Sequence, residues 1–173
     1  RHEPRRASWS FLKGSVGDLP LAEGEIWQVD VRPTRLGAAD RKAPRMRTLA
    51  ITNADDGQII ALQPWDQSDK PTPREILIAV VEAMRQPQSG EPRRPEAVQV
   101  LRKAYCQSWI PKLAEISVRC ELIDGCDFID GLMDRMEEMG ASTQLSAAER
   151  QRLAEGVSDL PQEVDEVWQV ASR

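Results

Sequence analysis

The chain has few of the residues from which metal and redox centres are built. Its 173 residues include one histidine, His2, and three cysteines, Cys106, Cys120 and Cys126. An odd number of cysteines without a C-x-x-C pair does not fit a disulfide framework. Zinc sites need several histidine or cysteine ligands. We therefore expect no metal site of this kind and three free thiols in a reducing cytoplasm.

Long apolar runs and the common catalytic motifs are absent as well. No apolar run reaches the length that spans a bilayer, and the sequence has no G-x-G-x-x-G, G-x-x-x-x-G-K-[ST], H-E-x-x-H or G-x-S-x-G motif. Nucleotide-binding, zinc-protease and esterase activities therefore have no motif support. The composition, 40% hydrophobic and 29% charged, is that of an ordinary globular chain. We expect a soluble cytoplasmic protein without a membrane partner.

One stretch of the chain occurs twice. Residues 12–29, LKGSVGDLPLAEGEIWQV, and residues 153–170, LAEGVSDLPQEVDEVWQV, align without gaps, and nine of the eighteen positions are identical. The identical pairs are Leu12/Leu153, Val16/Val157, Asp18/Asp159, Leu19/Leu160, Pro20/Pro161, Glu25/Glu166, Trp27/Trp168, Gln28/Gln169 and Val29/Val170. Self-similarity of this kind is typical of a repeated unit. We predict one complete module over 1–145, with a flexible tail at 1–7, and a helix and strand at 146–173 that open a second copy.

Capping signals and apolar periodicity predict alternating strands and helices. Thr72-Pro73-Arg74-Glu75 combines an N-cap residue, a proline at the first helical position and an acidic residue three places after the cap. Asn53 to Gly57 has turn composition between two β-rich runs, which predicts a hairpin. The predicted strands are 25–32, 46–53, 58–64, 96–101 and 117–123. The predicted helices are 8–14, a helix from 73, 103–115 with a kink or break at Pro111, 126–139 with Gly140 as C-cap, and 146–155.

This order defines a fold class. Strands that follow helices need right-handed crossovers, so the last two strands are expected to lie parallel to one another and to one of the first three. We predict an α/β fold with a mixed five-stranded sheet in the order β-β-β-α-β-α-β-α and helices on the sheet faces. Over residues 25–140 this order is similar to the ribonuclease H-like fold. The resemblance implies a nuclease that binds divalent metal ions through carboxylates on the first strand, the first long helix, the end of the fourth strand and the last helix.

Three acidic residues match these places. They are Asp30 in the first strand, Glu75 in the first long helix and Asp127 in the last helix, with Asp130 one turn further on. The end of the fourth strand carries Arg102-Lys103 instead of an acid. Two hard cations held close together need several oxygen ligands, and a guanidinium nearby disfavours them. In the simpler interpretation Asp30 faces solvent, and Glu75 and Asp127 are N3 residues that favour helix starts.

A second resemblance is to an uncharacterised bacterial domain family. Its features are a strand with a tryptophan near the start, a hairpin with a D-x-G-like turn and an arginine- and proline-rich entry into a later strand. The matching residues are Trp27, Asp55-Asp56-Gly57 and Arg93-Arg94-Pro95. This resemblance implies a bacterial source and no known activity.

Basic residues of two loops form a candidate binding patch. They are Arg41, Lys42, Arg45 and Arg47 from one segment and Arg93 and Arg94 from another. If the two segments meet in space, they would attract phosphate groups. The patch has no interleaved aromatic residues on which bases could stack, so an ordinary solvated surface is the competing interpretation.

The incomplete acid set favours a non-catalytic protein-interaction or scaffold module that has no catalytic residue, metal or cofactor. One alternative is a Mg²⁺-dependent nuclease that uses Asp30, Glu75 and Asp127. The other is nucleic-acid binding through the arginine-rich loops. An apolar C-terminal strand without a sheet of its own would also allow oligomers to form by pairing with an exposed sheet edge.

The repeat predicts that the last residues add nothing to the core of the first module. Deleting residues 158–173 should leave the melting temperature nearly unchanged, because the strand that contains Trp168 belongs to a second copy. Differential scanning calorimetry of the full and shortened chains measures this. A large drop would show that the tail is part of the first core.

Overall fold

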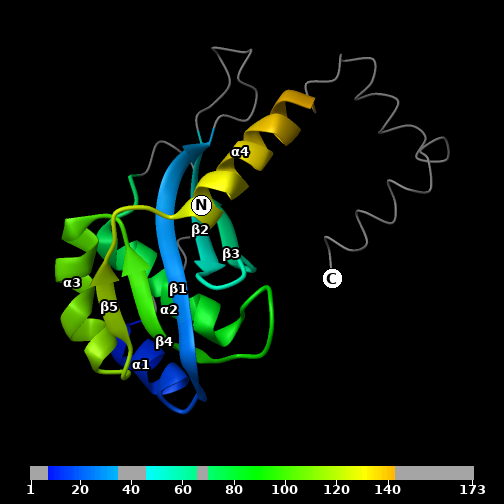
Figure 1. Cartoon of the computed structure of the whole chain (residues 1–173). Helices are drawn as coiled ribbons and strands as arrows, with labels where there is room; N and C mark the ends of the chain where they lie inside the picture. Colours follow the sequence, from blue (N-terminus) through cyan, green and yellow to red (C-terminus); the bar gives the residue numbers. More distant parts are fainter. Residues whose placement is uncertain (1–7, 35–45, 66–69, 143–173) are drawn as a thin grey trace, which may run out of the picture.

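A five-stranded mixed sheet forms the centre of the computed structural model, which describes residues 8–34, 46–65 and 70–142 (Figure 1). The elements follow the chain as α1 (Trp9–Gly17), β1 (Leu21–Thr34), β2 (Met46–Asn53), β3 (Ile59–Trp65), α2 (Pro73–Arg85), β4 (Arg94–Val100), α3 (Lys103–Ala114), β5 (Arg119–Leu122) and α4 (Asp127–Ser142). The predicted tail at 1–7, the helix at 146–155 and the second copy at 153–170 lie outside the described residues.

The strands lie in the order β3-β2-β1-β4-β5. β1 pairs antiparallel with β2, which pairs antiparallel with β3. On its other side β1 pairs parallel with β4, and β4 pairs parallel with β5. The mixed α/β sheet predicted from the sequence is confirmed, including the parallel arrangement of the last two strands. β1 has neighbours on both edges, so the sheet is built outward from it.

The two faces of the sheet are covered unequally. Trp27, Val29 and Val31 occupy every second position of β1 and point to the same face of the sheet. There they join a large apolar cluster that also contains side chains of α1, α2 and α3. The opposite face carries a smaller cluster, in which Cys126 and Ile129 at the start of α4 pack near Ala50 of β2. Figure 1 shows α4 crossing β1 and β2 in front of the sheet while α1 and α2 lie behind it. None of the described helices is long and apolar enough to cross a membrane.

Local signals place the start of α2 and the β2–β3 hairpin correctly, whereas β1, predicted over 25–32, runs from Leu21 to Thr34 and α1, predicted over 8–14, runs from Trp9 to Gly17. Thr72 caps α2, and its hydroxyl accepts a hydrogen bond from the Glu75 backbone N–H at 3.2 Å. The β2–β3 hairpin turns at Gly57, whose φ of +72° is accessible to glycine at little cost. A Cβ at this position would lie 2.3 Å from the Phe128 ring of α4. The turn therefore requires glycine for its backbone conformation and for packing against α4.

Two predictions about helix ends are wrong, and the break predicted at Pro111 is absent. Gly140 does not end the last helix, because α4 continues to Ser142. Asp127 is the first helical residue rather than the third, since the Cys126 carbonyl accepts the first intrahelical hydrogen bond from Asp130 at 2.9 Å. Pro111 does not divide α3, which runs unbroken from Lys103 to Ala114. Pro111 removes one backbone donor, the N–H that would bond to the Gln107 carbonyl, and the helix continues past it.

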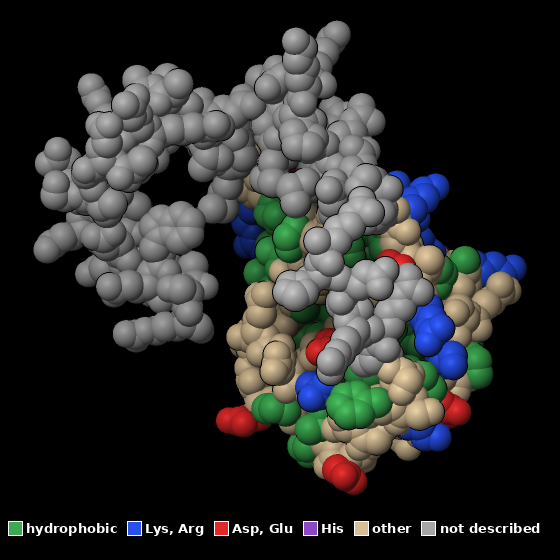
Figure 2. Space-filling model, turned by 180° about the vertical axis from the view of Figure 1, so that it is seen from behind, with side chains coloured by type: hydrophobic (Ala, Val, Ile, Leu, Met, Phe, Trp, Pro, Cys, Tyr) green, Lys and Arg blue, Asp and Glu red, His purple; other side chains and the backbone are tan. Residues whose placement is uncertain are grey.

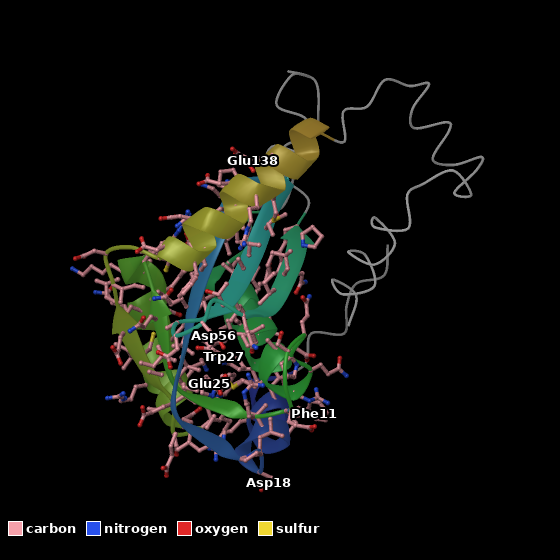
Figure 3. The ribbon with its side chains drawn as sticks, turned by 45° about the vertical axis from the view of Figure 1, so that its right-hand side comes forward. Phe11, Asp18, Glu25, Trp27, Asp56 and Glu138 are labelled. Atoms are coloured by element: carbon pink, nitrogen blue, oxygen red, sulfur yellow. The ribbon has the colours of Figure 1, made fainter. Side chains whose placement is uncertain are left out.

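An ion pair joins β1 to the entry of β4. The guanidinium of Arg93 donates to the Glu25 carboxylate at 2.7 and 2.9 Å and lies 5.6 Å from the centre of the Trp27 ring. Trp27 Nε1 donates to the same carboxylate at 2.8 Å, and Figure 3 shows Glu25 and Trp27 side by side on β1. Burial by itself raises the pKa of Glu25, but the hydrogen bonds from Arg93 and Trp27 and the charge of Arg93 bring it below its ordinary value.

Replacing Glu25 with Gln should destabilise the fold in a pH-dependent way. The folded-state pKa of Glu25 is lowered from 4.5, so its contribution is present above that pH and is lost as the pH falls through the folded-state pKa. We expect E25Q to lower the free energy of unfolding by about 1–3 kcal/mol at neutral pH. Urea unfolding at pH 7 and at about pH 3 measures this. Glu23→Gln, at an exposed position of the same strand, is the control. A deficit of the same size at both pH values would contradict the ion-pair explanation.

Candidate functional site

The carboxyl ends of β1 and β4 form the natural place for a site in this sheet. These strands are adjacent and parallel, but the chain leaves them in opposite directions. After β1 it continues to β2, and after β4 it passes through α3 to β5 on the other side. In open α/β sheets, ligands commonly bind outside the carboxyl ends of strands at such a point. The charged residues that make contacts with one another here are Asp30 and Arg32 of β1, Arg102 after β4 and Asp130 of α4.

Asp30 is buried rather than solvent-facing. It is only 5% exposed, because it points to the sheet face that α4 covers. Its Oδ2 atom lies 2.7 Å from Nε of Arg32, and its Oδ1 atom lies 3.9 Å from Nε of Arg102. The sequence interpretation that placed Asp30 on a solvated face is therefore wrong. The carboxylate is held between two arginines.

Arg32 connects this carboxylate to α4. Its guanidinium pairs with both Asp30 and Asp130. Burial by itself lowers the pKa of Arg32, but hydrogen bonds to Asp30 and Asp130 and their charges raise it above its ordinary value. Arg32 therefore stays protonated and bridges the strand and the helix. In the sequence, Asp130 stands out only by its position one helical turn after Asp127.

Arg102 occupies the end of β4, where the resemblance calls for an acid. One of its terminal nitrogens donates to the Val31 carbonyl at 3.3 Å, and its guanidinium lies 5.7 Å from the centre of the Tyr105 ring. Its side chain is 54% exposed, so the positive charge lies between Asp30 and solvent. An arginine at this distance from Asp30 repels a divalent cation and competes with it for the carboxylate.

The three candidate acids are not brought together. Glu75 lies in the first turn of α2, a helix whose buried residues belong to the large cluster on the opposite face of the sheet from Asp30. Asp127 is exposed at the start of α4. Within the described residues, no group of three or more His, Cys, Asp or Glu side chains is arranged to hold a metal ion. The site therefore combines acidic and basic residues and offers no set of oxygen ligands for two metals.

The thiol beside the site is not activated. Cys126 is fully buried in the cluster under α4. Burial raises its pKa to about 11, and the charge of Asp30 adds to the increase. Because the thiolate is the reactive form, Cys126 is a packing residue at neutral pH rather than a nucleophile.

The described residues of the basic patch are not assembled into one surface. In the strand register, Arg47 of β2 lies opposite Pro33 near the carboxyl end of β1. Arg94 of β4 lies opposite Leu21 at the amino end of β1. Arg93 is bound to Glu25, and Arg94 donates to the carbonyls of Leu19 and Ile116 at 2.9 and 2.7 Å. Arg93 and Arg94 therefore stabilise the fold at the end of the sheet opposite Arg47. Arg41, Lys42 and Arg45 lie outside the described residues.

Comparisons with known proteins assign no family. No family model matches the chain, and no curated protein matches it. Among solved structures the chain is similar to a chain of the "CryoEM structure of simian T-cell lymphotropic virus intasome in complex with PP2A regulatory subunit B56 gamma", with 14% sequence identity and a TM-score of 0.48. The match covers 75% of this chain and 45% of that one, so the chain spans less than half the length of its match. A similarity this low identifies neither a site nor a function.

The two interpretations of Asp30 predict opposite effects of Asp30→Asn. In a metal site without metal, removing one of several repelling carboxylates stabilises the fold. In the observed arrangement it removes a buried partner of Arg32 and Arg102, and we expect a loss of about 1–3 kcal/mol in the free energy of unfolding. Chemical denaturation measures the difference. Asp134→Asn on the exposed side of α4 is the matched control and should change little. A D30N variant that is more stable than the wild type would contradict the ion-pair interpretation.

Proposed function

We propose that this chain is a non-catalytic module with ribonuclease H-like topology that serves as a protein-interaction or scaffold domain. The observation that carries this proposal is the position of the β1 carboxylate, Asp30, between Arg32 and Arg102. In a metal-dependent nuclease this carboxylate would coordinate a cation. Here two guanidinium groups take up its charge.

Two features support the ribonuclease H-like part of the proposal. The first is the order of the elements from β1 to α4, with three antiparallel strands followed by alternating helices and strands. The second is the position of Asp30 on the central strand, next to the end of β4. Arg102 then stands at one of the four places that carry acids in that family. The combination fits a relative that keeps the topology without the catalytic carboxylates.

The edge of the sheet at β5 supports the interaction part. β5 pairs only with β4, so its outer backbone groups face no neighbouring strand of the described sheet. A hollow of about 510 Å³ lies between α3 and β5, and its lining includes Ile110, Val118 and Cys120. Ile110 and Leu122 are 48% and 51% exposed. A free strand edge beside an apolar hollow is the kind of surface to which an extended segment of a protein partner can add as a further strand.

The distribution of charged side chains supports nucleic-acid binding less than it supports protein binding. In the described part of the face shown in Figure 2, basic and acidic side chains lie interspersed among hydrophobic and neutral ones. Arg93 and Arg94 have their guanidinium groups occupied by Glu25 and by backbone carbonyls. Neither residue is free to take a phosphate without giving up contacts that hold β4 in place.

Metal titration separates the non-catalytic module from the nuclease. A metal ion that binds only the folded state raises the melting temperature. We expect the module to bind no such ion, so Mg²⁺ or Mn²⁺ at millimolar concentration should leave the melting temperature unchanged. A thermal shift assay, paired with a nuclease assay on single-stranded and duplex RNA and DNA, makes the measurement.

Asp30→Asn is the control in both assays. A metal-induced shift, or cleavage that requires metal and is abolished in this variant, would establish the nuclease and overturn the proposal. Binding of nucleic acid that weakens steeply as salt is added would favour the second alternative instead.

A further inference from the structure

Two of the three thiols lie in contact with each other. Cys106 comes from α3 and Cys120 from β5, and their Sγ atoms are 4.0 Å apart. Both are free thiols, as is Cys126. Cys126 belongs to the cluster under α4 on the other face of the sheet, whereas Cys106 belongs to the large cluster and Cys120 packs against it. The fold therefore pairs two cysteines that are fourteen residues apart in sequence and keeps the third away from them.

The pair is accessible from one side. Cys106 is 8% exposed, but Cys120 is only partly buried and lines the hollow between α3 and β5. The hollow, about 510 Å³ in volume, is large enough to admit part of a small organic disulfide. A reagent can reach Cys120 through this hollow. After it reacts there, Cys106 is the nearest thiol.

The surrounding elements allow the two sulfur atoms to approach. A disulfide requires a separation of about 2.05 Å, so the pair has to close from 4.0 Å. β5 is a strand of four residues at the edge of the sheet, with a partner on one side only. A short edge strand is the element best able to move toward α3, because it breaks few hydrogen bonds when it shifts.

We propose that Cys106 and Cys120 form a reversible disulfide that links α3 to the edge strand β5. The oxidant is a low-molecular-weight disulfide. One cysteine thiolate attacks a sulfur of the reagent, which releases one reagent thiolate and leaves a mixed disulfide. The second cysteine thiolate then attacks the protein sulfur of that mixed disulfide and displaces the second reagent thiolate. Two electrons pass from the cysteines to the reagent, and the two cysteine protons end on its thiols.

The environment makes this exchange slow near neutral pH. Burial, followed by the neighbouring Cys106, raises the pKa of Cys120 to about 12. Very little of it is then the reactive thiolate at neutral pH. The rate should increase with pH and keep increasing above about pH 9, where an ordinary thiol is already largely ionised.

The disulfide would fix the surface beside it. Ile110, Ala114 and Val118 line the same hollow as Cys120, so a covalent link between α3 and β5 sets its width. This redox site does not depend on the proposed function. It exists or fails to exist whether or not a partner binds there.

Thiol counting with peptide mapping tests the proposal on the full chain. The folded protein is incubated with oxidised glutathione at about pH 8.5, quenched with acid, unfolded and alkylated. We expect the loss of two thiols, a mass decrease of two hydrogens before alkylation, and a peptide that links Cys106 to Cys120, while Cys126 is alkylated. Dithiothreitol should restore all three thiols, and the oxidised form should melt at a higher temperature, because the crosslink restricts the unfolded chain.

Single substitutions identify the pair. Cys126→Ser should oxidise like the wild type, whereas Cys106→Ser and Cys120→Ser should give no internal disulfide and at most a glutathione adduct on the remaining thiol. The unfolded chain in urea serves as a control for reagent activity. If the folded wild-type chain yields only glutathione adducts or intermolecular dimers, or keeps all its thiols while the unfolded chain is oxidised, the proposal is wrong.

Discussion

The pairing of β1 on both edges and its burial on both faces is the constraint on which the rest of this structure depends. β2 and β4 occupy its edges. Trp27, Val29 and Val31 require an apolar layer on one side, which α1, α2 and α3 supply. On the other side Asp30 is buried and needs a cation, because an isolated carboxylate in that position is very costly. Arg32 supplies the cation and also binds Asp130. The packing of β1 therefore also sets where α4 is anchored.

The same constraint decides what the site can do. A carboxylate on the central strand of a mixed sheet, at the point where the chain leaves in two directions, is well placed for chemistry. Whether it performs any depends on its neighbours. With Arg102 at the end of β4 and Arg32 beside it, Asp30 already has its counter-charges. Breaking a buried pair leaves an uncompensated charge, so a metal ion has to displace partners that the fold itself needs.

The sequence predicted the features that depend on short-range physics. The four residues from Thr72 to Glu75 predict the start of α2, and the composition of Asn53 to Gly57 predicts a turn. The alternation of apolar and polar residues along β1 identifies its apolar face. Apart from the helix ends at Asp127 and Gly140 and the break expected at Pro111, the errors concern contacts between distant segments. The burial of Asp30 depends on the path of α4 over β1 and β2. The separation of Arg47 from Arg93 depends on strand direction, since β2 and β4 run oppositely beside β1. The pairing of Cys106 with Cys120 follows from α3 packing on β5. Spacing in the sequence carries none of this information.

The described module also gives physical meaning to the repeated stretch. Among the positions identical in both copies, Leu12, Val16, Trp27 and Val29 are buried in the large cluster. Glu25 binds Arg93, and Gln28 donates to Gln99 of β4 at 3.1 Å. The repeated residues are thus mainly those that dock α1 and β1 onto the rest of a module.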